Sequence, residues 1–406
     1  MIGPLTEQAK GAAAATPLGL YVHVPFCAST CDFCAFYQIV PTADSVGSFI
    51  EGVGIEAGIV DWPRQVSTVF WGGGTPAMLA PRDLERLAET VLRRTGGAPL
   101  EWTVEMAPAS VTPARLSVLR EAGVTRLSMG VQSFNPARLE ALGRRHTREQ
   151  VLRAYDLSRA AGFDNVNLDL MFALPGQGEA EWEADMAEAV ALAPEHISTY
   201  CITFEEDTAL WARLAAGLVK LDPEREARFY EATWETLAAA GYAQYEIANF
   251  ARPGRSCLHN INTWRMHEWI GLGPSAASQH AGWRGANVPD LAQWREGVGR
   301  GERMTRDRTR LAPALLAEDA LIFGLRQNAG VDLAEWRERC PEAPWDEATR
   351  LLSRMQDEGL VRAEGSRVLL TSRGRLVADG VGAELVGVFA SPDSAPASSP
   401  RRAGAP

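Results

Sequence analysis

Six short apolar runs alternate with six amphipathic stretches between residues 20 and 240, and this alternation limits the folds that the chain can adopt. The apolar runs have the length of strands, and the amphipathic stretches have the spacing of helices that cover a core. The expected strands are Leu20–Val24, Thr68–Trp71, Trp102–Met106, Arg126–Met129, Asn165–Met171 and His196–Ile202. The expected helices are Ser45–Ile59, Pro81–Arg94, Pro113–Ala122, Arg148–Ala161, Glu179–Ala193 and Pro223–Ala240. Six consecutive βα units predict an α/β fold with a parallel sheet, a partial TIM-like (β/α)6 barrel.

Three cysteines, Cys27, Cys31 and Cys34, follow the first expected strand in a C-x3-C-x2-C array. Barrels of this kind carry their chemistry at the C-terminal ends of the strands, which is where this loop begins. Three thiolates in one loop can hold a 4Fe-4S cluster and leave one iron open to a ligand from outside the protein. A zinc knuckle completed by His23, or a disulfide with a spare thiol, would use the same spacing. The spacing alone leaves these alternatives open.

A glycine run, Gly72-Gly73-Gly74, ends the second expected strand and leads into Thr75 and Pro76. Three glycines let the backbone approach a small polar ligand closely and leave N–H and C=O groups free to bind it. Taken by itself, the run fits a plain tight turn equally well.

Together, the cysteine array and the glycine run resemble the radical S-adenosylmethionine superfamily. Segments that begin at Glu105, Arg126, Leu142 and Asn167 resemble its branch of oxygen-independent coproporphyrinogen III dehydrogenases and HemW-type haem chaperones. The resemblance implies a radical S-adenosylmethionine barrel with a 4Fe-4S cluster on the three cysteines. The residues that it implies around S-adenosylmethionine are Tyr21, Phe33, Gly73, Gly74, Thr75, Glu105, Gln132, Arg144 and Asp169.

These residue types suit the implied ligand. The planar fork of Arg144 matches a carboxylate, and Phe33 can stack on adenine. Glu105 and Asp169 can accept hydrogen bonds from ribose hydroxyls or from an amino group. Each charged residue, taken singly, fits a solvated surface position, but their common placement at the ends of expected strands favours a binding site.

One position and one segment distinguish the dehydrogenases from the HemW-type chaperones in this branch. Phe36 stands where the dehydrogenase carries a further cysteine, and the segment from Cys257 to Trp264 resembles the HNxxYW motif of the HemW-type chaperones. His259 is thereby implied as a haem ligand, with a hydrogen-bonded structural histidine as the alternative. The resemblance implies a protein that binds haem and passes it to an acceptor protein, with the dehydrogenase as the alternative and enzymatic activity left open. An electron donor such as flavodoxin or ferredoxin is a further implied partner.

The pattern changes after residue 240. We expect a closing segment beside the barrel mouth up to residue 290, and a polar linker with some helix over residues 287–310. Helices followed by a hairpin predict a winged-helix-like C-terminal domain over residues 291–390, after a barrel of residues 18–290. Its expected elements are Leu311–Arg326, Leu333–Glu338, Trp345–Glu358, a hairpin of Leu360–Ala363 with Arg367–Leu370, and Arg373–Val386. Composition predicts a flexible N-terminus over residues 1–17 and a disordered tail over residues 391–406.

Charge and composition narrow the function further. The 406 residues carry a formal net charge of −11, which argues against broad, non-specific nucleic-acid binding and leaves room for a small basic patch. The six cysteines lack the density of a secreted disulfide framework, and no signal peptide or membrane-spanning run is visible. We therefore expect a cytoplasmic protein that binds no nucleic acid, and leave peripheral membrane contact open.

Overall fold

The computed structural model describes residues 16–219 and 222–389. Contacts divide the chain into two units: residues up to 263 with 267–310, and residues 264–266 with those from 311 onward. Residues 1–15 of the expected flexible N-terminus and the whole expected tail, 391–406, lie outside the described residues. The domain boundaries predicted from the sequence, residues 18–290 and 291–390, remain predictions.

One twelve-stranded sheet forms the frame of the first unit, in the order β12-β11-β10-β9-β1-β2-β3-β4-β5-β6-β8-β7. Its six consecutive parallel strands are β1 (Leu18–Val24), β2 (Thr68–Gly73), β3 (Glu101–Met106), β4 (Arg126–Gln132), β5 (Val166–Phe172) and β6 (His196–Cys201). All six expected strands are present. The sheet does not close on itself, so the prediction of a partial barrel is confirmed.

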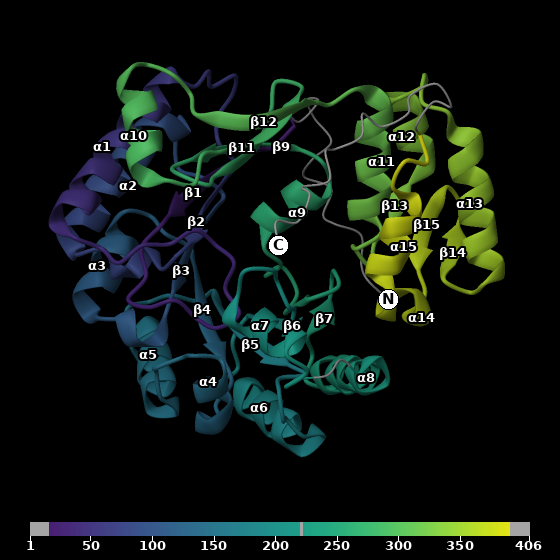
Figure 1. Cartoon of the computed structure of the whole chain (residues 1–406), viewed down its shortest axis with the longest axis horizontal. Helices are drawn as coiled ribbons and strands as arrows, with labels where there is room; N and C mark the ends of the chain where they lie inside the picture. Colours follow the sequence, from purple (N-terminus) through teal and green to yellow (C-terminus); the bar gives the residue numbers. More distant parts are fainter. Residues whose placement is uncertain (1–15, 220–221, 390–406) are drawn as a thin grey trace. The chain divides into compact units, whose positions relative to one another are not determined.

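Helices lie along the outer face of these strands (Figure 1). The six that the sequence predicted are α1 (Ala43–Ile59), α2 (Pro81–Thr95), α3 (Pro113–Glu121), α5 (Arg148–Ala160), α6 (Glu179–Ala191) and α8 (Pro223–Ala239). Prolines occupy the first turns of α2, α3 and α8, where their missing N–H group is not needed. The sequence did not predict α4 (Pro136–Ala141) and α7 (Ala209–Ala215), because six or seven residues hold too few turns to show a period.

Successive side chains along β1 point alternately to the hydrophobic core and to the barrel interior. Leu18, Leu20, Val22 and Val24 are fully buried in the hydrophobic core that includes residues of α1. The residues between them point to the other face of the sheet, the barrel interior. On β3 to β6 the interior residues are largely polar and buried, among them Glu101, Thr103, Arg126, Ser128, Asn167, His196 and Ser198. Barrel interiors are usually filled by branched apolar side chains, so this polar lumen is a departure that needs a reason.

Residues after 240 contain more strand than we expected. The elements are β7 (Ala243–Gln244), β8 (Asn249–Ala251), α9 (Leu258–Trp264), β9 (Glu268–Leu272), β10 (Ala277–His280), β11 (Trp283–Asn287), α10 (Leu291–Gly299) and β12 (Thr305–Arg310). β9 pairs with β1 in parallel, and β10 to β12 continue the sheet antiparallel. The prediction of a linker is wrong for β12, which forms an edge strand. Its sequence, TRDRTR, is exposed and polar, so it lacks the apolar alternation by which strands are found.

The second unit contains the expected helices and hairpin. They are α11 (Pro313–Gly324), α12 (Leu333–Arg339), α13 (Trp345–Asp357), β14 (Val361–Glu364) and β15 (Arg367–Leu370). A two-residue strand, β13 (Val331–Asp332), adds to the hairpin. The expected last helix is two helices, α14 (Ser372–Leu376) and α15 (Ala378–Leu385), because Val377 has a non-helical φ of −120° and ψ of 29°. In the part of the chain that the structure describes, no helix has both the length and the apolar character of a membrane span.

Candidate functional site

The cysteine loop leaves the C-terminal end of β1 and is tied down by backbone hydrogen bonds. The Cys27 N–H group donates to the Ile39 carbonyl at 3.0 Å, and the Asp32 N–H group donates to the Leu142 carbonyl at 3.1 Å. The first bond closes the loop on itself, and the second anchors its middle to the chain beyond α4. A short loop fixed at two points can hold several side chains in one place without a helix or strand of its own.

The three loop cysteines are free thiols, each half-buried. Burial raises the pKa of Cys27 and Cys31, and negative charge on Cys34 raises it further, while the charge of Arg144 lowers it. The charges of Cys34 and Arg144 act on both Cys27 and Cys31, so these groups lie close together, and the guanidinium offsets part of the rise in the pKa of Cys27 and Cys31 that burial causes.

The alternatives to a cluster find less support at this loop. His23 is engaged through both ring nitrogens: Nε2 lies 3.1 Å from the Tyr37 carbonyl oxygen and Nδ1 lies 3.2 Å from the Tyr21 hydroxyl. Among the described residues, no three His, Cys, Asp or Glu side chains are grouped to hold one metal ion.

The glycine turn after β2 lies directly against the cysteine loop. The Gly74 N–H group donates to the Val24 carbonyl at 2.9 Å, and the Thr75 N–H group donates to the Phe26 carbonyl at 2.8 Å. The Cys27 Sγ atom lies 3.6 Å from the Thr75 Oγ1 atom. Gly73 has a φ of 95°, in the left-handed region where a side chain would be strained. The two motifs that are 45 residues or so apart in sequence therefore form one site.

Two buried carboxyl groups face this site from β3 and β5. Glu105 Oε2 accepts a hydrogen bond from the Gly73 N–H group at 3.2 Å. Burial and the nearby Asp169 raise the pKa of Glu105 to about 8, and burial also raises the pKa of Asp169. Asn167 Nδ2 donates to Asp169 at 2.7 Å, which fixes the orientation of that carboxyl group. Ionising two neighbouring buried carboxyl groups costs free energy, so this pair suits a ligand that carries a positive charge.

The remaining predicted residues around the sulfonium ligand lie at the same edge. The Arg144 guanidinium lies 5.7 Å from the centre of the Phe33 ring, and its charge acts on Cys27 and Cys31. The Arg144 Nε atom is buried and has no hydrogen-bond partner within residues 16–219 and 222–389. Gln132 has a φ of 66° at the end of β4, and the charge of Glu105 raises the pKa of Tyr21 beyond what burial does. An orphaned guanidinium N–H group beside buried acids fits a ligand with both a carboxylate and a cation.

His259 is the predicted residue that the structure does not place here. It lies in α9, and its Nδ1 atom is 3.0 Å from the hydroxyl of Thr68, the first residue of β2. Its backbone N–H group donates at 3.0 Å to Glu101, the first residue of β3. These are the N-terminal ends of strands whose C-terminal ends carry the cysteine loop and the glycine turn. His259 is buried, and burial lowers its pKa to about 4, so its environment is that of a hydrogen-bonded structural histidine.

Sequence reasoning missed the polar group that holds α9. Glu101 accepts hydrogen bonds from the Leu258 N–H group at 2.9 Å and from the Cys257 thiol at 3.4 Å, as well as from His259. Arg126 is fully buried close to Glu101. The sequence does contain a sign of this polar group in β3. Glu101 and Glu105 are spaced by four residues, so their side chains point to the same face of the strand.

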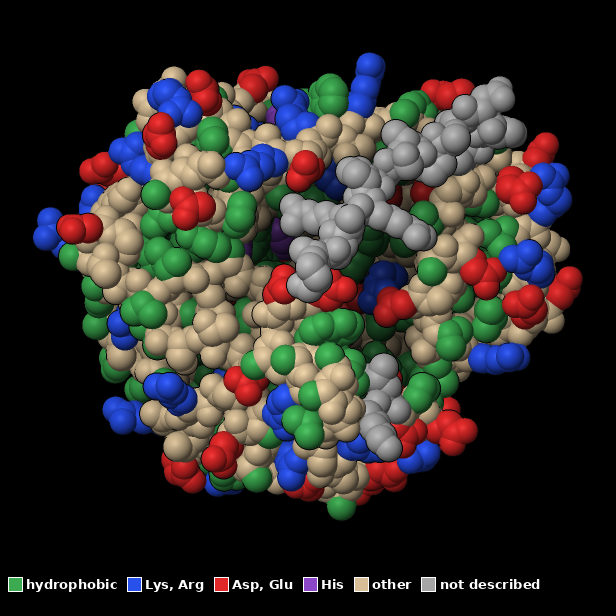
Figure 2. All heavy atoms as spheres, viewed as in Figure 1, with side chains coloured by type: hydrophobic (Ala, Val, Ile, Leu, Met, Phe, Trp, Pro, Cys, Tyr) green, Lys and Arg blue, Asp and Glu red, His purple; other side chains and the backbone are tan. Residues whose placement is uncertain are grey.

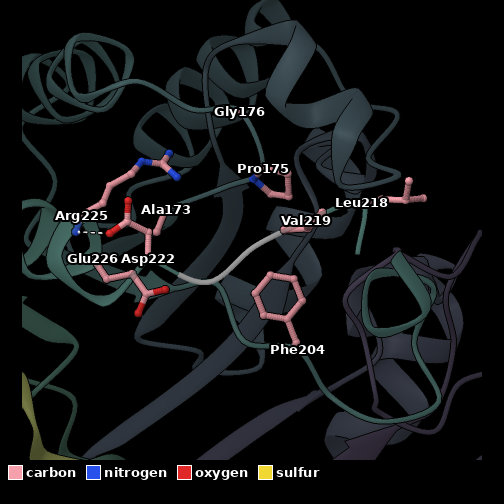
Figure 3. Close-up of a pocket in the computed structure, with 9 residues that line it drawn as sticks. All are labelled: Ala173, Pro175, Gly176, Phe204, Leu218, Val219, Asp222, Arg225 and Glu226. Carbon is pink, nitrogen blue, oxygen red and sulfur yellow. Dashed lines mark hydrogen bonds between the residues drawn. The ribbon is translucent and has the colours of Figure 1, made fainter. Parts of the chain in front are cut away.

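A pocket of about 180 Å³ opens beside the segments that follow β5 and β6. Figure 3 shows the Phe204 ring on one side and the charged side chains of Asp222, Arg225 and Glu226 on another, with Ala173 among them. The Arg225 N–H group donates to Asp222 Oδ1 at 3.0 Å. Sites for whole cofactors are usually larger than about 300 Å³, so this pocket has room for a small molecule or for part of a larger one.

Residues 21–189 match the Radical SAM superfamily, and residues 311–377 match the HemN C-terminal domain. The chain is 31% identical to the haem chaperone HemW of Bacillus subtilis, over 91% of this chain and 98% of that protein. It is 34% identical to HemW of Mycobacterium tuberculosis, over 91% of this chain and 95% of the relative. The mitochondrial radical S-adenosyl methionine domain-containing protein 1 of Danio rerio is 33% identical, over 81% of this chain and 77% of that protein.

Among solved structures, coproporphyrinogen III oxidase HemN from Escherichia coli superposes with a TM-score of 0.79 at 24% identity, covering 91% of this chain and 90% of that one. This likeness extends the fold match to nearly the whole chain. At that identity it bears on the fold and not on the reaction.

Proposed function

The chain belongs to the radical S-adenosylmethionine superfamily and, within it, to the HemW family, and from this membership we propose that it is a haem chaperone. It binds a 4Fe-4S cluster, S-adenosylmethionine and haem, and it passes haem to an acceptor protein. The observation that carries the cofactor part is the direct contact between the cysteine loop and the glycine turn, with Cys27 Sγ 3.6 Å from Thr75 Oγ1. The haem part rests on the relatives, which bear the name haem chaperone.

Cys27, Cys31 and Cys34 are the proposed cluster ligands. A cluster held by these thiolates would supply the electron that S-adenosylmethionine accepts. The Gly73–Thr75 turn and Glu105 would hold the methionine amino group, since backbone and carboxylate oxygens accept from it. Arg144 would pair with the methionine carboxylate, and Asp169 and Gln132 would meet the nucleoside, with Phe33 and Tyr21 as aromatic walls. The electron donor, a flavodoxin or ferredoxin, and the cytoplasmic location are part of the same proposal.

Oxygen-independent coproporphyrinogen III dehydrogenase is the second candidate, favoured only by the shared fold. Phe36, at the position of that enzyme's further cysteine, is 66% exposed, and it provides no ligand. Incubation with coproporphyrinogen III, S-adenosylmethionine and a reductant separates the two functions. We expect no protoporphyrinogen above background, and its formation would favour the dehydrogenase.

Haemin titration of the anaerobically reconstituted protein tests the chaperone function directly. We expect stoichiometric uptake with a shifted haem absorbance band, both with the cluster and after the cluster is removed. Transfer is then followed by the loss of that band on adding an apo-haem protein. If no haem binds at stoichiometric level, the chaperone proposal fails while the cluster proposal stands.

Replacing His259 with alanine is expected to weaken haem binding about tenfold or more while sparing the cluster, because haem iron would lose an axial nitrogen. For that nitrogen to reach the iron, α9 must shift away from Thr68 and Glu101, which hold it now. Thr68→Val is the matched control, since it removes the hydrogen bond of His259 and keeps the imidazole. If both variants lose haem affinity equally, His259 has a structural role only.

Glu105 gives the proposed S-adenosylmethionine site a pH dependence. Its folded pKa of about 8 lies above the ordinary value of 4.5, so its contribution to stability is full at low pH and is lost as pH rises through about 8. A cationic ligand favours the ionised carboxylate and offsets that loss. We therefore expect affinity for S-adenosylmethionine, measured by equilibrium dialysis, to rise between about pH 6.5 and 8.5 relative to Glu105→Gln. Parallel profiles for the two proteins would contradict the assignment.

A further inference from the structure

His196, on β6, is a buried titratable residue to which the site described above gives no role. Four of the six histidines are buried, and little histidine is visible on the face shown in Figure 2. The His196 side chain is fully buried in the polar barrel interior, beside Asn167 of the neighbouring strand β5. A polar ring in such a place needs a hydrogen-bond partner at each of its two nitrogen atoms.

Hydrogen bonds join His196 to Asp169 on one side and to the start of α9 on the other. The His196 Nδ1 atom lies 2.6 Å from Asn167 Oδ1, and Asn167 Nδ2 donates to Asp169 Oδ1 at 2.7 Å. The His196 Nε2 atom lies 2.8 Å from the Tyr245 hydroxyl oxygen, which accepts from the Cys257 N–H group at 3.2 Å. One continuous chain of hydrogen bonds therefore runs from the proposed S-adenosylmethionine site to the residue that precedes α9.

The backbone at one end of this chain sets the tautomer of the histidine. The Cys257 N–H group can only donate, so the Tyr245 oxygen accepts from it and gives its own proton to His196 Nε2. The Nε2 atom is then the acceptor, and Nδ1 carries the ring proton and donates to Asn167 Oδ1. Burial and the charge of Arg126 lower the pKa of His196, which keeps the ring neutral.

The proton on Nδ1 determines which way the Asn167 amide faces. Its Oδ1 atom accepts from His196 and, at 3.1 Å, from the Ser198 hydroxyl. Its Nδ2 atom faces the other way and donates to Asp169 and to Ser128 Oγ, both at 2.7 Å. The reversed amide would set its oxygen against the Asp169 carboxyl group and its N–H groups against the N–H group of His196. Removing the donor at His196 therefore removes a constraint on Asp169.

We propose that His196 is a positioning residue for S-adenosylmethionine, holding the Asp169 carboxyl group through Asn167 in the orientation that meets the nucleoside. This inference rests on the proposed function, in which Asp169 contacts that ligand. A carboxyl group that is already oriented in the free protein spares binding the free-energy cost of ordering it. The role also gives a reason for the polar interior of the barrel, because these side chains support the site from within the sheet.

Equilibrium dialysis of S-adenosylmethionine against the anaerobically reconstituted full chain tests this role. His196→Leu removes the donor, and we expect the affinity to fall about tenfold. His196→Asn returns an amide N–H group close to the place of Nδ1, and we expect it to restore the affinity to within about threefold of the wild type. Wild-type affinity in His196→Leu would overturn this inference alone. No binding by the wild-type protein would overturn the proposed function, and this inference with it.

Tyr245→Phe is the matched control within the same chain. It removes the hydrogen bond at Nε2, while Asn167 Oδ1 still selects the tautomer with the proton on Nδ1. We expect this variant to be less stable in urea and to bind S-adenosylmethionine as the wild type does. Equal losses of affinity in Tyr245→Phe and His196→Leu would show a general loosening of the barrel interior and contradict the positioning role.

Nitrogen-15 NMR of the histidine-labelled protein reads the tautomer without any change to the site. The chain has six histidines, and the signal that disappears in His196→Asn belongs to His196. We expect a protonated Nδ1 atom and an unprotonated Nε2 atom near neutral pH. A protonated Nε2 atom would reverse the direction of the chain and overturn the proposal, even where the variants fold poorly.

Discussion

Each single replacement of Cys27, Cys31 or Cys34 with alanine should leave the anaerobically reconstituted protein without a 4Fe-4S cluster. Each thiolate would hold a different iron, so the loss of one opens a second corner of the cube to solvent, and two remaining ligands do not retain it. We expect iron and sulfide to fall below about a tenth of the wild-type content, with no cluster signal by electron paramagnetic resonance after reduction. The circular dichroism spectrum should not change, because the loop lies outside the strands and helices.

Cys201→Ala is the matched control. Cys201 is a free, half-buried thiol like the three loop cysteines, and it ends β6 instead of following β1. We expect this variant to keep its iron. A cluster that survives the loss of a loop cysteine, or disappears with Cys201, would show that the ligand set is a different one.

The parts of the fold that the sequence predicted are those in which a helix covers one face of each strand and the other face lines the barrel interior. β1 to β6 carry continuous or alternating apolar residues, and each is followed by an amphipathic helix, so the period reveals both. β12 shows the limit of this reasoning. An edge strand that exposes Arg306, Arg308 and Arg310 obtains its structure from pairing with β11, which no local pattern records.

The candidate site likewise has one part that could be predicted from the sequence and one part that could not. The cysteine loop and the glycine turn each follow a strand, so their meeting at one edge of the sheet could be predicted from chain order. The position of His259 could not, because it depends on Glu101, which lies 158 residues earlier in the chain. The motif identified the residue, but only the long-range capping of α9 shows that its imidazole is buried at the other end of the strands.

Gly74→Ala should lower affinity for S-adenosylmethionine by more than tenfold, or about 1.4 kcal/mol and above. A Cβ atom at this position would lie 2.7 Å from the Val24 carbonyl oxygen and 2.8 Å from the Phe26 N and O atoms. These are backbone atoms of β1 and of the start of the cysteine loop, so they cannot turn aside as a flexible side chain would. The turn and the loop must separate, which also moves Thr75 away from Cys27. We expect the free energy of unfolding, measured in urea, to fall by about 2 kcal/mol.

Gly47→Ala separates this effect from the general cost of a larger residue. Gly47 lies within α1, and a Cβ atom added there would meet nothing within 4 Å. Alanine favours the helix over glycine by about 0.5–1 kcal/mol, so this variant should be slightly more stable and bind S-adenosylmethionine as the wild type does. Unchanged affinity in Gly74→Ala would mean that the contact between the glycine turn and the cysteine loop does not shape the ligand site. Because the same contact joins the two motifs, retention of the cluster in Gly74→Ala would further show that the loop can hold iron without support from β2.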